Sequence, residues 1–456
     1  DMEGNLLLQA AKARSASALD VAAVAERSKS GSSGPYAQAA ELLDSTSSDF
    51  GKSSQVHEND LAEVVVVCEP GLQKQMGALH PAAALYERFV NIEKSISEHA
   101  NFRETLRKRG VKVLTVREIL RHGLDRNLRC RIDLEDLAMG FLTYQADSVQ
   151  GESTPTSRDK LNKDLKEHIS DSYKRLVLEN MSPDQLIDVI LTKPTVTVKP
   201  SFRDTGFTAS YEFEPLTNLI FTRDQQITTA KGIVMASLRS SQRQHEIKVM
   251  KFCFQKLGIN VLGQVDQPGY LEGGDFFPAG EGLCFVGVGL RSNEEAVVQL
   301  MEKDYFGTTR VAIVKDMFEK DQDRMHLDCV FSILSNDCVL MLEDMMGADS
   351  PTRRLVDEYT IGDDGKYTKS KSDVEFSQYL VDGGYKIIPV TGEEQLQYAC
   401  NVVNLGGSRI LSCHAPTARK ICKSPHFSGT MEYLEYSAIT AMYGALHCST
   451  QIVKRS

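Results

Sequence analysis

Two cysteine–histidine pairs are candidates for a nucleophilic site. His447-Cys448 lies in the segment LHCST, and Cys413-His414 lies in the segment SCHAP. A thiolate is a strong nucleophile when nearby cations lower its pKa. Glycine precedes both pairs, as Gly444 before the first and as a Gly-Gly turn before the second, so the spacing alone leaves both cysteines open as the nucleophile.

A histidine and a carboxylate lie two positions apart, as His326 and Asp328 in the segment RMHLDC. Residues i and i+2 of an extended segment share one face, so in a strand the two side chains would lie together. A carboxylate beside an imidazole holds it and raises its pKa, which suits general acid–base catalysis. A metal pair is a second interpretation, but no third histidine is near in the sequence.

Two further segments place polar side chains around apolar stretches. In EPLTNLIFTRD, the residues Asn218, Arg223 and Asp224 flank a predicted strand, and in YLEGGDFF the acids Glu272 and Asp275 surround a Gly-Gly turn. Taken singly, the first could be an ion pair at a strand end and the second a hairpin. Because α/β enzymes bind substrate at such strand ends, we predict that both segments contribute to a site.

A cysteine, a histidine and several acids together indicate a reaction class. Carboxylates can hold a guanidinium group bidentately while a thiolate attacks its central carbon. A papain-like protease would instead act on a neutral peptide carbonyl, and several buried acids would disfavour that substrate. The residues therefore favour attack on a cationic carbon.

The composition limits the kinds of partner and the cellular location that we expect for this protein. The 456 residues carry a formal net charge of −10, the wrong sign for broad binding to phosphates, so we expect no nucleic-acid partner. No apolar stretch approaches the roughly 18 to 20 residues of a membrane-spanning helix. The ten cysteines are scattered without a CxxC spacing, which is typical of reduced thiols in the cytoplasm. The sequence begins at Asp1 without methionine, which leaves an organellar location open.

The elements that would position the site alternate between strands and helices. Residues 1–60 are rich in alanine and serine, so we expect a flexible extension before a folded body over 61–456. A buried strand is predicted over 61–71, a helix over 82–109 and a strand over 110–116, followed by a helical insertion over about 117–200. The remainder reads as mixed α/β structure with no visible repeat.

From about residue 61 to 456, the sequence resembles the arginine deiminases of the guanidine-modifying (pentein) superfamily. The resemblance rests on EVVVVCEPG as a first strand and turn, on the place of the helical insertion, and on the order of the four segments above. It implies an α/β fold built as a five-bladed propeller. HCST is similar to the family's His-Cys-x-Thr signature, which favours Cys448 over Cys413 as the nucleophile.

The resemblance also implies a role for each catalytic candidate. Asp224 and Asp328 would bind the guanidinium group, and Glu272 would support it. His326 would transfer protons, and Cys448 would attack the guanidinium carbon.

Three more residues match the family at the amino-acid end of the substrate. Asn218 precedes Asp224 by six positions, Arg243 follows it by 19, and Arg291 follows Glu272 by 19. By the resemblance, Asn218, Arg243 and Arg291 would bind the α-carboxylate and α-amine. Deiminases often carry an arginine shortly before the nucleophile, whereas this sequence has a tyrosine at position 443.

The implied activity is hydrolysis of free L-arginine to L-citrulline and ammonia through a covalent thiouronium, with no metal or organic cofactor. The segment ITAMYGALHCSTQIVKR is more similar to the arginine dihydrolases, which release ornithine and two ammonia molecules, but those relatives have asparagine where this chain has Asp224. The same residues are also compatible with an amidinotransferase or with a catalytically inactive arginine sensor. We also expect a homo-oligomer.

Overall fold

The computed structural model describes residues 43, 53–147, 155–201, 206–280 and 282–456. Most of the predicted extension over 1–60 therefore lies outside the described residues. Residues 53–60, which the sequence placed in the extension, are packed against the body, with Gln55 and Glu58 both buried. The folded part thus includes residues before 61.

Each of the six sheets within the described ranges contains a strand that pairs antiparallel with one neighbour and parallel with the other. In five of them the parallel neighbour is the strand that follows later in the chain, and these five share one plan. The strands are, in sheet order, β20 (Gln451–Arg455), β1 (Ala62–Val67) and β2 (Lys112–Thr115); β6 (Gln226–Thr228), β7 (Ile233–Met235) and β8 (Val261–Gln264); β9 (Phe276–Pro278), β10 (Leu283–Val288) and β11 (Arg310–Lys315); β12 (Phe331–Ile333), β13 (Cys338–Leu342) and β16 (Lys386–Val390); β17 (Val403–Asn404), β18 (Arg409–Ser412) and β19 (Thr430–Tyr433).

Each parallel pair is joined through a helix, as parallel strands require a crossover connection. The helices are α4 (Ile92–Lys108), α10 (Gln244–Lys256), α11 (Glu294–Glu302), α12 (Phe376–Asp382) and α14 (Ala415–Lys423). The chain thus repeats a ββαβ unit, although the sequence shows no repeat. The first unit is completed by the last strand, because β20 pairs antiparallel with β1.

The predicted helix over 82–109 begins later than the sequence indicated. The helix α4 starts at Ile92, because Asn91 caps it with its side chain. Residues before the cap form only a short 3₁₀ turn, η1 (Ala82–Ala84), and then Leu85 adopts a left-handed backbone with φ of 62°. This irregular segment borders the pocket described below.

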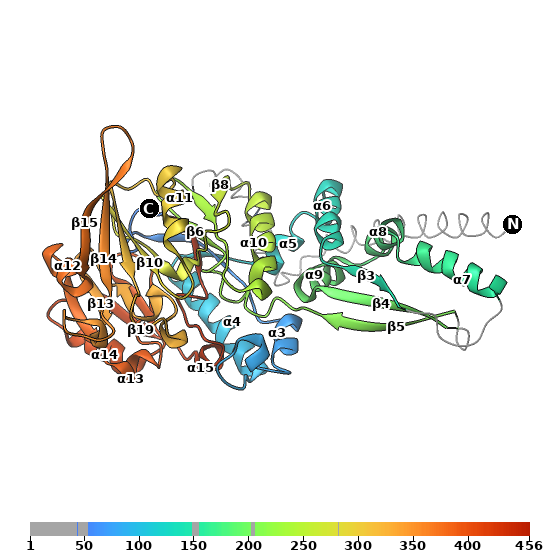
Figure 1. Ribbon diagram of the computed structural model, residues 1–456. Coiled ribbons are helices and arrows are strands. Elements are labelled where there is room, and N and C mark those ends of the chain that lie inside the picture. The colour runs from blue at the N-terminus through green and yellow to red at the C-terminus, as the bar shows by residue number, and fades with distance from the viewer. Residues whose placement is uncertain (1–42, 44–52, 148–154, 202–205, 281) are drawn as a thin grey trace.

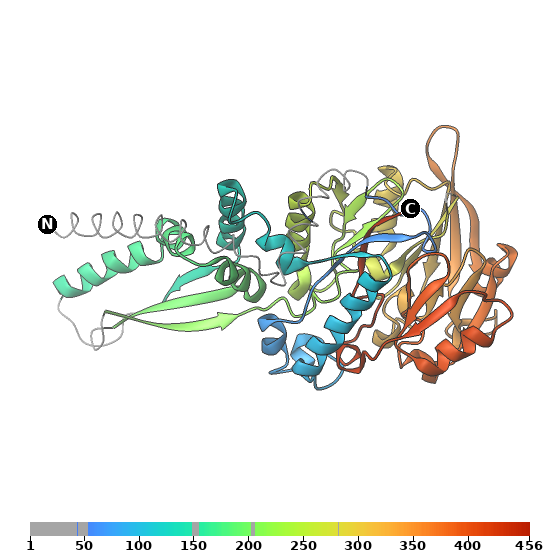
Figure 2. The same ribbon diagram turned by 180° about the vertical axis from the view of Figure 1, so that it is seen from behind.

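A group of helices and a small sheet projects from one end of the body (Figures 1 and 2). The helices are α5 (Val116–Arg121), α6 (Leu128–Met139), α7 (Pro155–His168), α8 (Asp171–Glu179) and α9 (Pro183–Thr192), and the strands are β3 (Thr143–Ala146), β4 (Pro194–Ser201) and β5 (Gly206–Phe213). Capping boxes at Thr115 and Ser182 begin α5 and α9. The strands β3 and β4 lie in a region that the sequence predicted to be almost wholly helical.

A long hairpin extends the sheet of the third unit (Figure 1). Its strands β14 (Leu355–Ile361) and β15 (Tyr367–Glu375) continue the sheet from β11 in antiparallel fashion. Within the described residues, no helix is both long enough and apolar enough to cross a membrane.

Candidate active site

Cys448 lies on the turn between the short helix α15 (Ser437–Thr440) and β20, and its side chain is buried. The side-chain amide of Asn401 donates a hydrogen bond to its Sγ at 3.1 Å, and Sγ lies 3.4 Å from Asp328 Oδ2. Burial and then the Asp328 carboxylate raise the pKa of this thiol well above its usual range. With the pocket empty, Cys448 is therefore a protonated thiol.

Asp328 is paired with His447 rather than with His326. His447 Nδ1 lies 2.8 Å from Asp328 Oδ2, whereas His326 Nδ1 lies 4.0 Å from Asp328 Oδ1. The expected strand at this point is wrong, because residues Leu327–Cys329 form a 3₁₀ turn, in which positions i and i+2 point in different directions. Burial opposes ionisation of Asp328, but the hydrogen bond from His447 keeps its pKa below the ordinary value.

His326 is held by Glu272 and faces two other carboxylates. Its Nε2 lies 2.8 Å from Glu272 Oε2, and its Nδ1 lies 3.9 Å from Asp224 Oδ1. Burial alone would lower the pKa of His326, but Asp224, Glu272 and Asp275 together raise it to about 10. His326 is therefore a buried imidazolium at neutral pH. Burial would likewise raise the pKa of Glu272, but the contact with His326 lowers it to about 2.

Asp224 faces His326 on one side and an arginine on the other. Its Oδ2 accepts a hydrogen bond from Arg243 Nη1 at 2.8 Å, while its buried Oδ1 has no hydrogen-bond partner among the described residues. The predicted strand around Leu219 to Phe221 is wrong, since these residues form turns and strand β6 begins only at Gln226. An unpaired buried carboxylate oxygen is costly, and a bound cation would satisfy it.

The two arginines predicted to bind the substrate differ in their environments. Arg243 is held by Asp224, by Glu246 at 2.9 and 3.1 Å, and by the carbonyl of Asn218 at 3.3 Å. Arg291 donates to Gln322 at 3.2 Å, and its buried Nε has no hydrogen-bond partner among the described residues. Arg291 is therefore the arginine with hydrogen-bonding capacity left for an anion.

The Gly-Gly turn of the EGGD segment forms a 3₁₀ turn, η3 (Gly273–Asp275), rather than a hairpin. A Cβ atom at Gly274 would lie 2.7 Å from His326 Nδ1, and one at Gly273 would lie 2.0 Å from the carbonyl oxygen of Arg223. Both glycines therefore allow a close approach that any side chain would prevent. The turn brings Glu272 to His326.

These side chains border one pocket. Its lining includes every predicted residue except Glu272 and Asp328, which lie directly behind His326 and Cys448. The lining residues are Leu85, Asn218, Phe221, Asp224, Arg243, Arg291, Gln322, Met325, His326, Met442, Tyr443 and Cys448. Tyr443 replaces the expected arginine and, like Leu85, has a left-handed backbone, with φ of 65°. Such non-glycine residues cluster at functional sites.

Sequence reasoning missed two residues that support Cys448, namely Asn401 and Glu58. Asn401 binds the Sγ atom and also accepts hydrogen bonds from the backbone N–H groups of His447 and Cys448, at 3.0 and 3.3 Å. Glu58 pairs with Arg455 and lies 3.9 Å from His447 Nε2. Asn401 and Glu58 lie far from the motifs in the sequence, so no local pattern points to them. The only sequence feature that indicated a partner for Cys448 was the adjacent His447.

The rival cysteine lies in a different setting. Cys413 packs against an apolar cluster, and burial raises the pKa of its thiol to about 12. Its neighbour His414 makes its side-chain hydrogen bond with Thr417 at 2.8 Å, at the start of α14. After burial, the carboxylates of Glu435 and Glu98 also raise the pKa of this thiol, and Cys413 does not line the pocket that contains His326.

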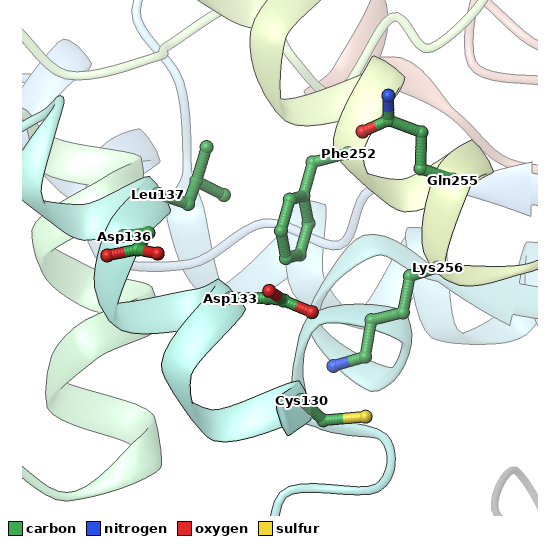
Figure 3. A pocket seen from close by; sticks show the side chains of 7 residues that line it. All are labelled: Cys130, Asp133, Asp136, Leu137, Phe252, Gln255 and Lys256. Carbon is green, nitrogen blue, oxygen red and sulfur yellow. The ribbon is translucent and has the colours of Figure 1, made fainter. Parts of the chain in front are cut away.

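A second cavity lies between α6 and α10 (Figure 3). It is lined by Cys130, Asp133, Asp136, Leu137, Phe252, Gln255 and Lys256. Its acids already pair with arginines, Asp133 with Arg129 and Asp136 with Arg175. It shares no lining residue with the pocket at Cys448.

The arrangement also meets the distance requirement of a metal site. Ligand atoms of Asp224, Glu272 and His326 lie within 4.8 Å of one another. A metal ion there would have to displace the proton that Asp224, Glu272 and Asp275 hold on His326, whose pKa is about 10.

The fold and the pocket agree with a class of enzymes, the hydrolases that act on the C–N bonds of amidines. A family model described as arginine deiminase matches residues 83–455. The chain belongs to the arginine deiminase family, and it is an arginine deiminase-like hydrolase.

Individual relatives are distant in sequence. The arginine deiminases of Halobacterium salinarum and Mycobacterium marinum are each 24% identical, in alignments that cover 61% and 76% of this chain and 75% and 83% of those proteins. Among solved structures, dimethylarginine dimethylaminohydrolase from Pseudomonas aeruginosa is 13% identical with a TM-score of 0.46, over 87% of this chain and 100% of that one. The N-terminal domain of a cyanobacterial arginine dihydrolase is 16% identical with a TM-score of 0.41, over 69% and 97%.

Proposed function

We propose that the chain hydrolyses the guanidinium group of free L-arginine to give L-citrulline and ammonia. The observation that carries this proposal is the pair of unsatisfied buried atoms, Asp224 Oδ1 and His326 Nδ1, that face a pocket containing the Cys448 thiol. A guanidinium group has the charge and the N–H donors to satisfy Asp224. The membership in the arginine deiminase family agrees with this substrate.

Substrate binding would activate the nucleophile. The Asp328 carboxylate disfavours a thiolate in the empty pocket, and a bound guanidinium beside the His326 imidazolium reverses that electrostatic effect. Cys448 then releases its proton to solvent, and the thiolate attacks the guanidinium carbon, forming a C–S bond as a C–N π pair moves to nitrogen. His326 gives its proton to the departing nitrogen, the C–N bond breaks, and ammonia leaves an S-alkylthiouronium.

The second half of the reaction restores the enzyme. The neutral His326 removes a proton from a water molecule, whose oxygen attacks the thiouronium carbon. The C–S bond then breaks, its electron pair returns to sulfur, and citrulline leaves. Glu272 keeps His326 in position throughout, since it holds the Nε2 side of the ring at 2.8 Å and leaves Nδ1 facing the pocket.

The amino-acid end of the substrate would lie near Arg291 and Asn218. Arg291 has an unsatisfied Nε for the α-carboxylate, while Arg243 is saturated by acids and would mainly orient Asp224. We further propose that the five ββαβ units are the five blades of a propeller around this pocket. Four of them carry catalytic candidates shortly before a strand: Asp224 before β6, Glu272 before β9, His326 and Asp328 before β12, and Cys448 before β20.

Product analysis tests the activity. The purified chain is incubated with L-arginine, with and without glycine, and the products are identified by mass spectrometry. We expect citrulline and one equivalent of ammonia in both cases, unchanged by a chelator. Ornithine with two equivalents of ammonia would assign the dihydrolase reaction, and guanidinoacetate an amidinotransferase. Binding without any product would assign an arginine sensor.

A further inference from the structure

Lys74 is a fully buried lysine that lies behind one wall of the candidate pocket. It belongs to the short helix α3 (Leu72–Gly77). Its Nζ donates a hydrogen bond to the backbone carbonyl of Thr217 and another to the hydroxyl of Tyr86, the latter at 3.2 Å. Burying an amine is costly, and an apolar side chain could fill this position at lower cost. The burial of this lysine therefore needs a structural or functional explanation.

The two acceptors of Lys74 belong to the two segments that form this wall. The Tyr86 hydroxyl also donates to the Thr217 carbonyl, at 3.3 Å, and the Asn218 side chain donates to the carbonyl of Ala84, at 3.0 Å. Leu85 lies between the two tethered residues of its segment, and both Leu85 and Asn218 line the pocket. Lys74 thus joins the segments from behind.

The tethers explain how Leu85 keeps an unfavourable backbone. Its φ of 62° and ψ of 35° are left-handed, which is unfavourable for a residue other than glycine. Such a conformation persists only where the surroundings hold it. The contacts of Ala84 and Tyr86 hold it on both sides, and the contact of Tyr86 includes the ammonium of Lys74.

The surroundings of the ammonium exclude a simple ion pair. No carboxylate of the described residues lies within 4 Å of Lys74 Nζ, which instead lies 5.0 Å from the centre of the Tyr86 ring and 5.7 Å from that of Phe221. The charged side chains of Glu246 and Arg243 act on Lys74 electrostatically, but these two side chains already bind each other. The contribution of Lys74 is therefore its hydrogen bonds to the two segments.

We propose that Lys74 is a positioning residue for substrate binding, which joins Thr217 to Tyr86 and so fixes Leu85 and Asn218 against the amino-acid end of the substrate. The proposal rests on the proposed hydrolysis of arginine. Lys74 does not reach the pocket itself, so its loss should disturb binding of the substrate more than the chemical step.

The test compares the buried Lys74 with the half-buried Lys256. In Lys74→Met, we expect the KM for arginine to rise about tenfold or more, while kcat changes by less than about threefold. Lys256→Met is the matched control, since Lys256 Nζ also donates to a backbone carbonyl, that of Leu120 at 2.6 Å, but lines the remote cavity of Figure 3. We expect it to lower the Tm and leave KM unchanged.

A milder variant guards against a failure of Lys74→Met to fold. Tyr86→Phe removes only the hydroxyl, and we expect KM to rise in the same direction. In the double variant with Lys74→Met and Tyr86→Phe, the free-energy effects on KM should be less than additive, because both side chains belong to one hydrogen-bond network. An unchanged KM in Tyr86→Phe, or in a folded Lys74→Met whose Tm has fallen, would overturn the role of Lys74. A wild-type chain that does not convert arginine would instead overturn the proposed function.

Discussion

At the scale of single residues, the environment of Cys448 predicts a nucleophile that depends on its substrate. Cys448→Ser should reduce turnover of arginine by roughly 10⁴-fold or more, because a hydroxyl is a far weaker nucleophile at neutral pH. The near-isosteric replacement should leave the fold and arginine binding largely intact. Steady-state kinetics, together with calorimetric titration of arginine, measures both. Cys413→Ser is the control and should keep its activity; the reverse result would show that the nucleophile is misassigned.

Asp224→Asn should severely reduce turnover of arginine. The substitution leaves a neutral amide opposite the guanidinium, and the loss of a buried charge pair costs about 3–5 kcal/mol, or two to four orders of magnitude in kcat/KM. Asp266→Asn, at an exposed acid that pairs with Lys303, is the matched control and should behave like the wild type. Residual turnover that shifts towards ornithine would link this position to the number of hydrolyses. Unchanged kinetics would exclude Asp224 from the site.

Selectivity for the amino-acid end should depend on Arg291. Agmatine lacks the α-carboxylate, so it would leave Arg291 without an anion, at a cost on the order of 3–5 kcal/mol. We expect kcat/KM for agmatine to be two to four orders of magnitude below that for arginine. Arg291→Ala should reduce the activity on arginine far more than that on agmatine. Similar kcat/KM values for the two substrates in the wild type would contradict the assignment.

The sequence identified the reactive residue types but not their partners. Residue types near predicted strand ends indicated His326, Asp224 and two rival cysteines, and the family resemblance then favoured Cys448. Cys448, His326 and Asp224 all line one pocket. The pairing of Asp328 with His447 could not be predicted, because it depends on a 3₁₀ turn where the sequence indicated a strand. Asn401 lies 47 positions before Cys448, and no local pattern distinguishes it from other asparagines.

At the scale of elements, the site depends on how closely turns approach it. Gly274→Ala should reduce kcat/KM by roughly 10²-fold or more, since its Cβ would lie 2.7 Å from His326 Nδ1 and displace the ring or the turn. Gly282→Ala is the control, because the nearest atom to its Cβ would lie 3.5 Å away. Kinetics and circular dichroism of both variants test this. Full activity of Gly274→Ala would mean that His326 need not keep this position.

Regular elements were predictable where apolar periodicity is strong. The buried strand near 61–71 is confirmed as β1 and the strand over 110–116 as β2. The helix expected over 82–109 was predicted to begin too early. The helix α4 begins at Ile92 because the side chain of Asn91 caps it, although helical apolar spacing continues before this residue. Tertiary contacts hold the preceding segment, and these are not visible in the local sequence.

At the scale of the whole molecule, the buried His326–Glu272 pair should make stability depend on pH. His326 has a folded pKa of about 10, above the value of 6.5 expected when unfolded, so its contribution is fully present below pH 6.5 and is lost as the pH rises to about 10. Glu272, at about 2, loses its contribution as the pH falls below 4.5. In thermal unfolding, the Tm advantage of the wild type over His326→Gln should therefore shrink between pH 6.5 and 10. A constant difference would contradict the imidazolium assignment.

The repeat of five ββαβ units was the part of the fold that the sequence concealed. The units share strand order but not residues, because each central strand needs only apolar side chains and each connection differs in length. The third unit alone adds the β14–β15 hairpin, and the helices α5 to α9 interrupt the passage from the first unit to the second. A repeat defined by geometry alone leaves no periodic signal in the residues.

The pairing of β1 with β20 has a consequence for how the chain acquires activity. These strands lie almost 400 positions apart, and Cys448 immediately precedes the second of them. Contacts of such long sequence separation form late in folding, because the intervening chain must first be ordered. Helices and local hairpins can therefore form while the thiol is still far from Asp328 and Asn401. A refolding chain has no competent nucleophile until its most distant strands have met.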